Sequence, residues 1–148
     1  MKIINKIGII ILSTLMAISA WSCADENEAF KYVHDTNTIS QMLCMPMHGL
    51  QGYIAKIYEY NKDGEMLTGS FAQSDVEGGY GLILFAISKS LEEEVALSNI
   101  YLVASLSYDE FIMPSLSGRH DITGDGIIIT VKSGAGTIRQ YRVRGYYE

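Results

Sequence analysis

Three histidines and a short acidic segment are the side chains of this sequence that suggest a metal site. His34, His48 and His120 are too far apart for any two of them to share a metal-ligand spacing. The segment RHDITGDG contains Asp121 and Asp125, whose oxygens are ligands of the kind that Ca²⁺ gathers in sets of about six to eight. It lacks the D-x-D-x-D-G density of a calcium loop, so we expect Asp121 to accept hydrogen bonds within a turn. The sequence predicts no metal site, and Asp121 and Asp125 are the two candidates to inspect.

Two acidic runs, Glu92–Glu94 and Asp109–Glu110, are the candidates for acid–base catalysis. Catalytic carboxylates require a partner at a defined separation and a perturbed pKa, whereas adjacent acids in polar segments usually form a solvated face. The sequence contains no G-x-S-x-G motif, no Ser–His–Asp framework and no glycine-rich phosphate loop. We therefore predict a protein that is not an enzyme and that uses no cofactor.

The two cysteines have different surroundings in the sequence. Cys44 lies in the apolar run Met42–Met45, where a buried thiol is the usual state of a free cysteine. A reactive thiol requires a cationic neighbour that lowers its pKa, and the C-x-x-x-H spacing to His48 does not by itself establish one. We expect Cys44 to be a core residue. Cys23 instead follows the N-terminal segment of residues 1–22.

Residues 1–22 have the three parts of a signal peptide. Lys2 and Lys6 precede the uncharged apolar run Ile7–Ala20, and small residues lead on to Cys23. As a helix this run would be about 21 Å long, which is too short to cross a hydrocarbon core of about 30 Å. An abrupt polar segment begins at Cys23, which argues against a buried core helix. We predict that residues 1–22 are removed on export.

The junction Ser19–Cys23 resembles the lipobox of bacterial lipoproteins. The resemblance implies that Cys23 carries lipid and anchors the chain to a membrane. The acidic segment Asp25–Glu28 resembles the tract that accompanies export to the cell surface in Bacteroidetes lipoproteins, which implies the outer face of the outer membrane. The alternative is a solvated linker on the periplasmic face.

Net charge argues against nucleic acid as a partner. The chain has a formal charge of −6, and removal of residues 1–22 takes away Lys2 and Lys6, which leaves −8. Nucleic-acid binding depends on Lys and Arg that neutralise phosphates. We expect contact with the membrane only through the lipid on Cys23.

Residues 39–148 have the pattern of an all-β sandwich. Short runs of β-branched and aromatic residues alternate with turn residues, and no helical period of useful length appears. Residues 23–38 are polar and acidic, and we expect them to form a tether. Phe111–Leu116 is expected to be a short edge piece, because Pro114 removes a ladder donor. About seven strands are expected, at Ile39–Met45, Gln51–Tyr60, Glu65–Ala72, Tyr80–Ser88, Ile100–Ser107, Ile127–Lys132 and Ile138–Tyr147.

Turn residues and alternation define the local pairing and the buried faces. Asn61–Gly64 and Ser133–Gly136 each separate two candidate strands, which predicts two hairpins. A period of two in the final strand places Tyr141 and Val143 in the core and the arginines beside them in water. The run Tyr80–Ile87 is apolar on both phases, so we expect it to be a central strand.

The last strands together resemble a known family. The runs LILFAIS, IYLVASLS, IIITVKSGAG and IRQYRVRGYY follow one another, with Thr130-Val131 and Tyr141-x-Val143 in the last two. Their order is similar to the immunoglobulin-like domain of unknown function in Bacteroidetes cell-surface lipoproteins. The resemblance covers roughly Tyr80–Tyr147. It implies a single immunoglobulin-like β-sandwich on the cell surface, in proteins that often handle glycans or adhere, and it implies no site residues.

Tyrosines are the remaining candidates for contact with a ligand. Sugar binders stack aromatic rings on sugar faces and hold hydroxyls with amides and acids. We predict a lipid-anchored surface module that binds a glycan or a surface protein. The alternative is an adhesion or assembly subunit that pairs through an edge strand, while a hydrolase would require two convergent carboxylates in a cleft. The tyrosines that such a platform would draw on are Tyr53, Tyr58, Tyr60, Tyr80, Tyr101, Tyr108, Tyr146 and Tyr147.

Overall fold

The computed structural model describes residues 34–47 and 51–148, which belong to one compact unit. The predicted signal peptide, Cys23 and most of the predicted tether lie outside the described residues, and so does His48. Within the described part of the chain, no helix has both the length and the apolar character needed to cross a membrane.

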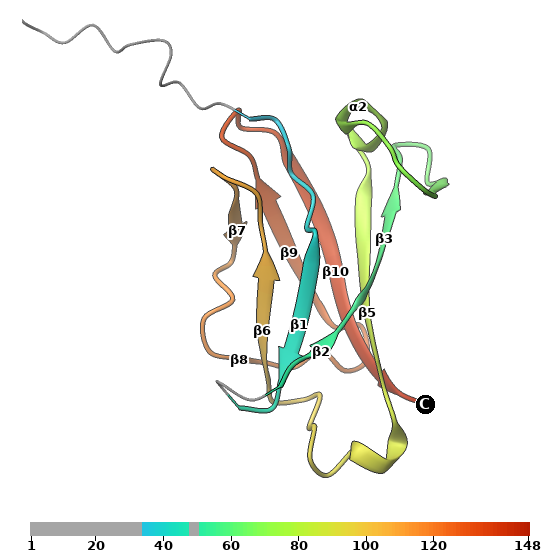
Figure 1. Ribbon diagram of the computed structural model, residues 1–148, viewed down its shortest axis with the longest axis vertical. Coiled ribbons are helices and arrows are strands. Elements are labelled where there is room, and N and C mark those ends of the chain that lie inside the picture. The colour runs from blue at the N-terminus through green and yellow to red at the C-terminus, as the bar shows by residue number, and fades with distance from the viewer. Residues whose placement is uncertain (1–33, 48–50) are drawn as a thin grey trace, which may run out of the picture. The chain divides into compact units, whose positions relative to one another are not determined.

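Two open β-sheets pack face to face (Figure 1). This confirms the predicted all-β sandwich. The smaller sheet has the order β2-β1-β6-β8, with β1 Gln41–Met45, β2 Tyr53–Ile54, β6 Ile100–Ser105 and β8 Arg119–His120. The larger sheet has the order β4-β3-β5-β10-β9-β7, with β3 Lys56–Tyr60, β4 Met66–Leu67, β5 Tyr80–Ile87, β7 Phe111–Met113, β9 Ile127–Lys132 and β10 Ile138–Tyr147.

The structure has ten strands instead of about seven, because one predicted strand divides in two, the expected edge piece forms β7, and β8 was not expected from the sequence. The expected strand Gln51–Tyr60 becomes β2 and β3, which belong to different sheets. The chain changes sheet at Ala55, whose N–H donates to the carbonyl of Met42 at 2.9 Å. Of the expected strand Glu65–Ala72 only β4 forms. Hydrophobic alternation reports which face a residue occupies and not which sheet it joins, so this division was not visible in the sequence.

Both predicted hairpins are confirmed. Strands β3 and β4 pair antiparallel around a turn in which Gly64 has φ of 80°, and the Asn61 side chain accepts from the N–H groups of Asp63 and Glu65. Strands β9 and β10 pair antiparallel with Ile138 opposite Lys132. The expected short edge piece is also confirmed as β7, at the border of the larger sheet.

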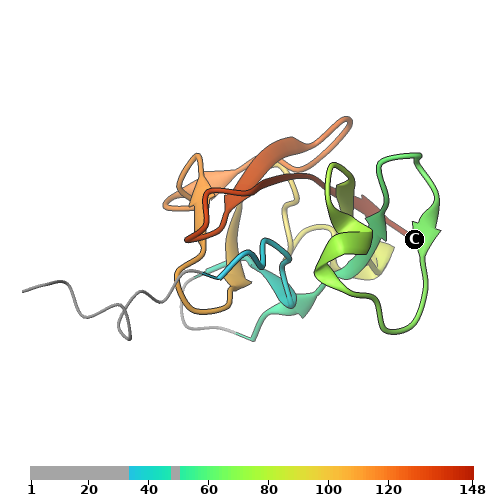
Figure 2. The same ribbon diagram turned by 90° about the horizontal axis from the view of Figure 1, so that it is seen from above.

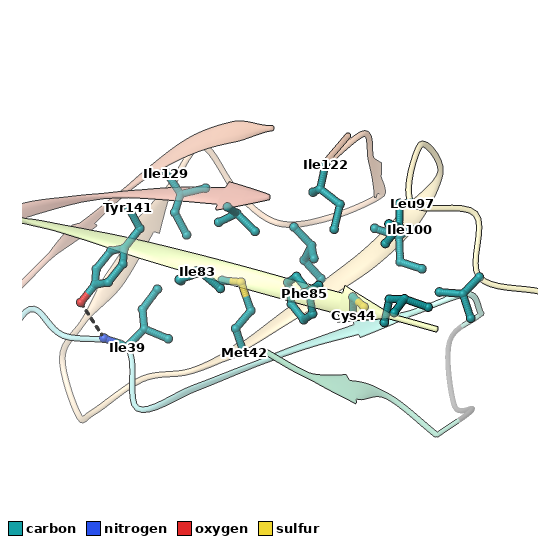
Figure 3. Close-up of a cluster of buried hydrophobic side chains, with 14 of the residues drawn as sticks. Ile39, Met42, Cys44, Ile83, Phe85, Leu97, Ile100, Ile122, Ile129 and Tyr141 are labelled. Carbon is teal, nitrogen blue, oxygen red and sulfur yellow. Dashed lines mark hydrogen bonds between the residues drawn. The ribbon is translucent and has the colours of Figure 1, made fainter. Parts of the chain in front are cut away.

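The predicted buried faces are confirmed as well. Tyr141 and Val143 of β10 are fully buried, whereas Arg142 and Arg144 are exposed. Strand β5 is central, with β3 antiparallel on one side and β10 parallel on the other. Cys44 lies in the core that Figure 3 shows, and burial raises the pKa of its thiol to about 12. That pKa describes an unreactive core cysteine.

A single helical turn, α2 Gln73–Val76, was not expected from the sequence. The N–H of Ala72 donates to the Asp75 carboxylate at 2.8 Å at its start, and Val76 is buried beneath it. A shorter 3₁₀ turn, η2 Lys89–Leu91, follows β5. Four residues are too few to produce a readable helical period. Residues of α2 line one wall of the polar hollow described below.

Candidate functional site

A polar hollow of about 470 Å³ lies at the end of the sandwich that carries α2. Figure 2 looks onto this end, with α2 on one side and the segment before β1 together with the β9–β10 turn on the other. Its volume is in the range of small-ligand sites. We call it the end pocket, and its lining residues are Asp35, Asn37, Gln73, Ser74, Glu77, Gly78, Gly136, Thr137 and Ile138.

The buried amide of Asn37 is fixed within the end pocket. Asn37 is only 3% exposed, and its Nδ2 donates to the hydroxyl of Thr137 at 3.1 Å. The amide of Gln73 donates to Asn37 Oδ1 at 3.0 Å. Thr137 in turn donates to the carbonyl of Asp35 at 2.8 Å and shares a 2.7 Å hydrogen bond with Ser133. Three segments far apart in the sequence therefore hold one set of amides and hydroxyls in place.

Residues 34–38, which the sequence assigned to the tether, form part of this wall. The N–H of His34 donates to the Asp109 carboxylate at 3.1 Å, and its carbonyl accepts from the N–H of Ala135 at 2.9 Å. Farther along the same segment, Asn37 is buried. The segment thus packs along the domain before β1 begins.

The polar groups of the end pocket favour a hydroxyl-bearing ligand over an anion. Asp35 and Glu77 contribute carboxylates, and none of the lining residues is a lysine, arginine or histidine. Carboxylates accept hydrogen bonds from hydroxyls, while amides and hydroxyls both donate and accept. Ile138 adds an apolar surface that is 62% exposed.

A buried arginine holds α2 and two strand ends together below the pocket. Arg139 is 1% exposed, and its guanidinium contacts the Glu59 carboxylate at 2.6 and 2.8 Å. It also donates to the carbonyls of Val76 in α2, Tyr60 at 3.0 Å and Tyr80 at 2.6 Å. Arg139 is therefore a positioning residue for the wall that carries Gln73 and Glu77.

Tyr141 completes this buried cluster. Its hydroxyl donates to Glu59 at 2.6 Å and accepts from the N–H of Ile39 at 3.2 Å, a bond drawn in Figure 3. Burial raises the pKa of Glu59, while the hydrogen bond from Tyr141 and the charge of Arg139 lower it. Burial, with the nearby charge of Glu59, raises the pKa of Tyr141. The ring fits because position 81 is glycine, where a Cβ would lie 2.0 Å from the tyrosine ring.

The structure places the two calcium candidates in a loop turn. The Asp121 carboxylate accepts from the N–H of Thr123 at 2.9 Å and from its hydroxyl at 2.6 Å, and these bonds lower the pKa of Asp121. This confirms the expected turn. Asp125 contributes its main-chain carbonyl to Arg142 at 2.9 Å. In the described part of the chain, no three His, Cys, Asp or Glu residues are grouped as a metal site would require.

The two acidic runs occupy separate loops. Glu92 pairs with Lys89 at 3.2 Å on the surface. Glu110 accepts from the N–H of Ser107 at 2.6 Å, and burial raises the pKa of its carboxyl. Asp109 lies 3.4 Å from the His34 imidazole. The structure does not bring these runs together into one cleft.

Tyrosines gather on the exposed side of the larger sheet. The rings of Tyr60 and Tyr80 stack with centroids 4.8 Å apart and planes inclined by 11°, and Tyr80 is 48% exposed. Tyr58 lies on the same face of β3 as Tyr60. Other tyrosines make structural contacts away from this surface: Tyr101 lies under the Arg119 guanidinium, and the Tyr147 hydroxyl donates to the carbonyl of Val95.

The strands at the sheet borders are short. Strands β2, β4 and β8 have two residues and β7 has three. Short edge strands oppose sheet-to-sheet pairing between molecules. The borders therefore offer little length for the assembly mode that was the alternative prediction.

No protein-family model matches this chain, and neither does any curated protein or solved structure. The resemblance to an immunoglobulin-like domain of Bacteroidetes lipoproteins therefore stays a prediction.

Proposed function

We propose that this chain is a lipid-anchored cell-surface module that binds a neutral glycan in its end pocket. The observation that carries the proposal is the buried Asn37 amide, which Thr137 and Gln73 hold in one orientation at a hollow of about 470 Å³. Groups that are ordered before binding lose less entropy when the ligand arrives. The pocket is thus prepared for a ligand that both donates and accepts hydrogen bonds.

A neutral sugar has the chemistry that this lining recognises. Its hydroxyls can donate to the carboxylates of Asp35 and Glu77 and can exchange bonds with the amide of Gln73. Its C–H face can lie against the exposed side chain of Ile138. An anionic ligand would instead meet two carboxylates and no cation among the lining residues.

A glycan array tests this proposal. The purified full chain should bind neutral glycans with and without a chelator. Release of reducing ends would contradict the view that the domain binds without reacting. Silence on every neutral glycan would move the assignment to the assembly alternative, despite the short edge strands.

Anchoring is tested separately through Cys23. We expect Cys23→Ala to abolish incorporation of labelled fatty acid and to leave the chain unprocessed or soluble. The matched control is Cys44→Ala, which changes the other cysteine and should keep the label. Labelled lipid on the Cys23→Ala chain would contradict the lipoprotein proposal.

A further inference from the structure

The exposed side of the larger sheet is basic, although the chain as a whole has a formal charge of −6. Its cations are Lys56 on β3, Lys132 on β9, and Arg142 and Arg144 on β10, all of them exposed. Burial alternates along these strands, so the exposed positions define one side, which we call the outer face. Its other members are uncharged: Tyr58, Tyr60, Met66, Tyr80, Leu82, Leu84, Ala86, Phe111, Met113, Ile128, Thr130, Ile138, Gln140 and Tyr146.

Strand register places three of these cations close together. Arg144 aligns with Leu84, which aligns with Lys56, so the arginine and the lysine lie two strands apart, or about 10 Å. Arg142 lies two residues before Arg144 on the same strand, about 7 Å away. Charges farther off on the acidic surface are screened over about 10 Å at moderate salt. Every charged side chain at a strand position of the outer face is therefore a cation.

The two arginines are oriented without being neutralised. Arg142 donates to the carbonyl of Asp125 at 2.9 Å, and Arg144 donates to the carbonyl of Gly124 at 2.7 Å. Neither guanidinium forms an ion pair with another described residue. Each keeps further N–H donors that can bind a carboxylate or sulfate through two parallel bonds.

A second hollow, of about 280 Å³, adjoins these cations. Tyr80, Ile128, Gln140 and Arg142 line it, over the main chain of Gly81. Tyr80 and Ile128 are about half exposed, at 48% and 49%. An aromatic ring, an amide and a guanidinium thus converge at one place, where a sugar ring can stack and its acidic substituent can be held.

We propose that the outer face binds an acidic polysaccharide, with sugar units that carry carboxylate or sulfate groups. Its sugar ring packs against Tyr80, and its acidic group binds Arg142, with Arg144 and Lys56 placed for the next unit. The hollow beside Arg142 suits a sugar unit better than a bilayer, which would lie across the face without entering the hollow. This second site differs in ligand class from the end pocket and does not depend on it.

The test measures binding of the full chain to polygalacturonate, with the fully methyl-esterified polymer as the uncharged comparison. We expect binding to the acidic polymer only, and a steep loss of affinity between low and moderate salt. Arg142→Gln should weaken it by about tenfold, because a bidentate charged contact is lost. Tyr80→Ala should also weaken it.

Arg119→Gln is the matched control, because Arg119 is exposed on the smaller sheet and also donates to a main-chain carbonyl, that of Asn99. Equal affinity of the two arginine variants would overturn the proposal, and so would equal binding of the esterified polymer. Binding to anionic phosphatidylglycerol vesicles without binding to the polymer would assign the outer face to a membrane instead. The probe is charged, so its result is independent of the neutral-glycan array.

Discussion

Replacement of Arg139 by methionine should be the most damaging single change to the stability of the domain. The guanidinium is 1% exposed, and it binds the Glu59 carboxylate and three main-chain carbonyls. Methionine fills part of the volume but donates no hydrogen bond. The variant therefore leaves a carboxylate buried without its cation.

The magnitude follows from this uncompensated charge. Removal of one partner from a buried ion pair costs about 3–5 kcal/mol of the free energy of unfolding. The free energy of unfolding of a natural domain is about 5–15 kcal/mol, so the variant should still fold without denaturant. The control is Arg142→Met on the same strand, which is exposed and should cost less than about 0.5 kcal/mol.

The loss should also depend on pH. Burial already raises the pKa of Glu59 from its ordinary value of 4.5, and removal of Arg139 takes away a charge that lowers it. A raised pKa means that the folded state binds the proton more tightly than the unfolded state does. The free energy of unfolding of Arg139→Met should therefore fall as the pH rises from 4.5 through the pKa of the folded state, more steeply than in the parent.

Urea unfolding followed by circular dichroism, at pH values on both sides of this range, measures both effects. Glu59→Gln placed in the Arg139→Met background should restore part of the lost stability and remove the added pH dependence. Equal costs for Arg139→Met and Arg142→Met would refute the argument. So would a loss that does not change with pH.

Three further outcomes are expected. Val143→Ala should lower the free energy of unfolding by about 1–3 kcal/mol because Val143 is fully buried, whereas Arg142→Ala should lower it by less than about 0.5 kcal/mol. Equal losses in urea unfolding would mean that the register is wrong. Cys44 should resist iodoacetamide at neutral pH in the folded chain, since its pKa is raised to about 12. It should react once guanidinium unfolds the protein, and mass spectrometry measures the added mass on Cys44 in both states. Asp121 should titrate by NMR below its ordinary pKa of 3.8, so its small contribution to stability is lost as the pH falls through that lowered pKa. Thr123→Ala should raise this pKa only part of the way back, because it removes the hydroxyl but keeps the main-chain N–H that also donates to Asp121.

The buried faces were predictable because alternation is a local property of the sequence. Tyr141 and Val143 follow a period of two, and the apolar run Tyr80–Ile87 identified a central strand. Arg139 lies on the same buried phase of β10. The reason that an arginine is tolerated there lies 80 positions away at Glu59, and no local pattern connects the two.

The end pocket was not predictable for a related reason. Asn37, Gln73 and Thr137 are ordinary polar residues in three separate segments, and only the fold brings their side chains into hydrogen-bond contact. The helical turn that carries Gln73 is too short to leave a periodic pattern. The acidic candidates, by contrast, were conspicuous in the sequence but lie in separate loops, whereas His34 precedes β1 and His120 lies in β8.

The most direct test of the account is a calorimetric titration of the end pocket. The ligand is the neutral oligosaccharide that binds best on the array, and the proteins are the full chain, Ser74→Trp and Ser90→Trp. Ser74 lines the end pocket, so an indole there should block it, whereas Ser90 lies on the exposed 3₁₀ turn η2. The account predicts that Ser74→Trp loses at least about tenfold in affinity while Ser90→Trp binds as the parent does. Unchanged binding by Ser74→Trp would contradict the end pocket as the glycan site.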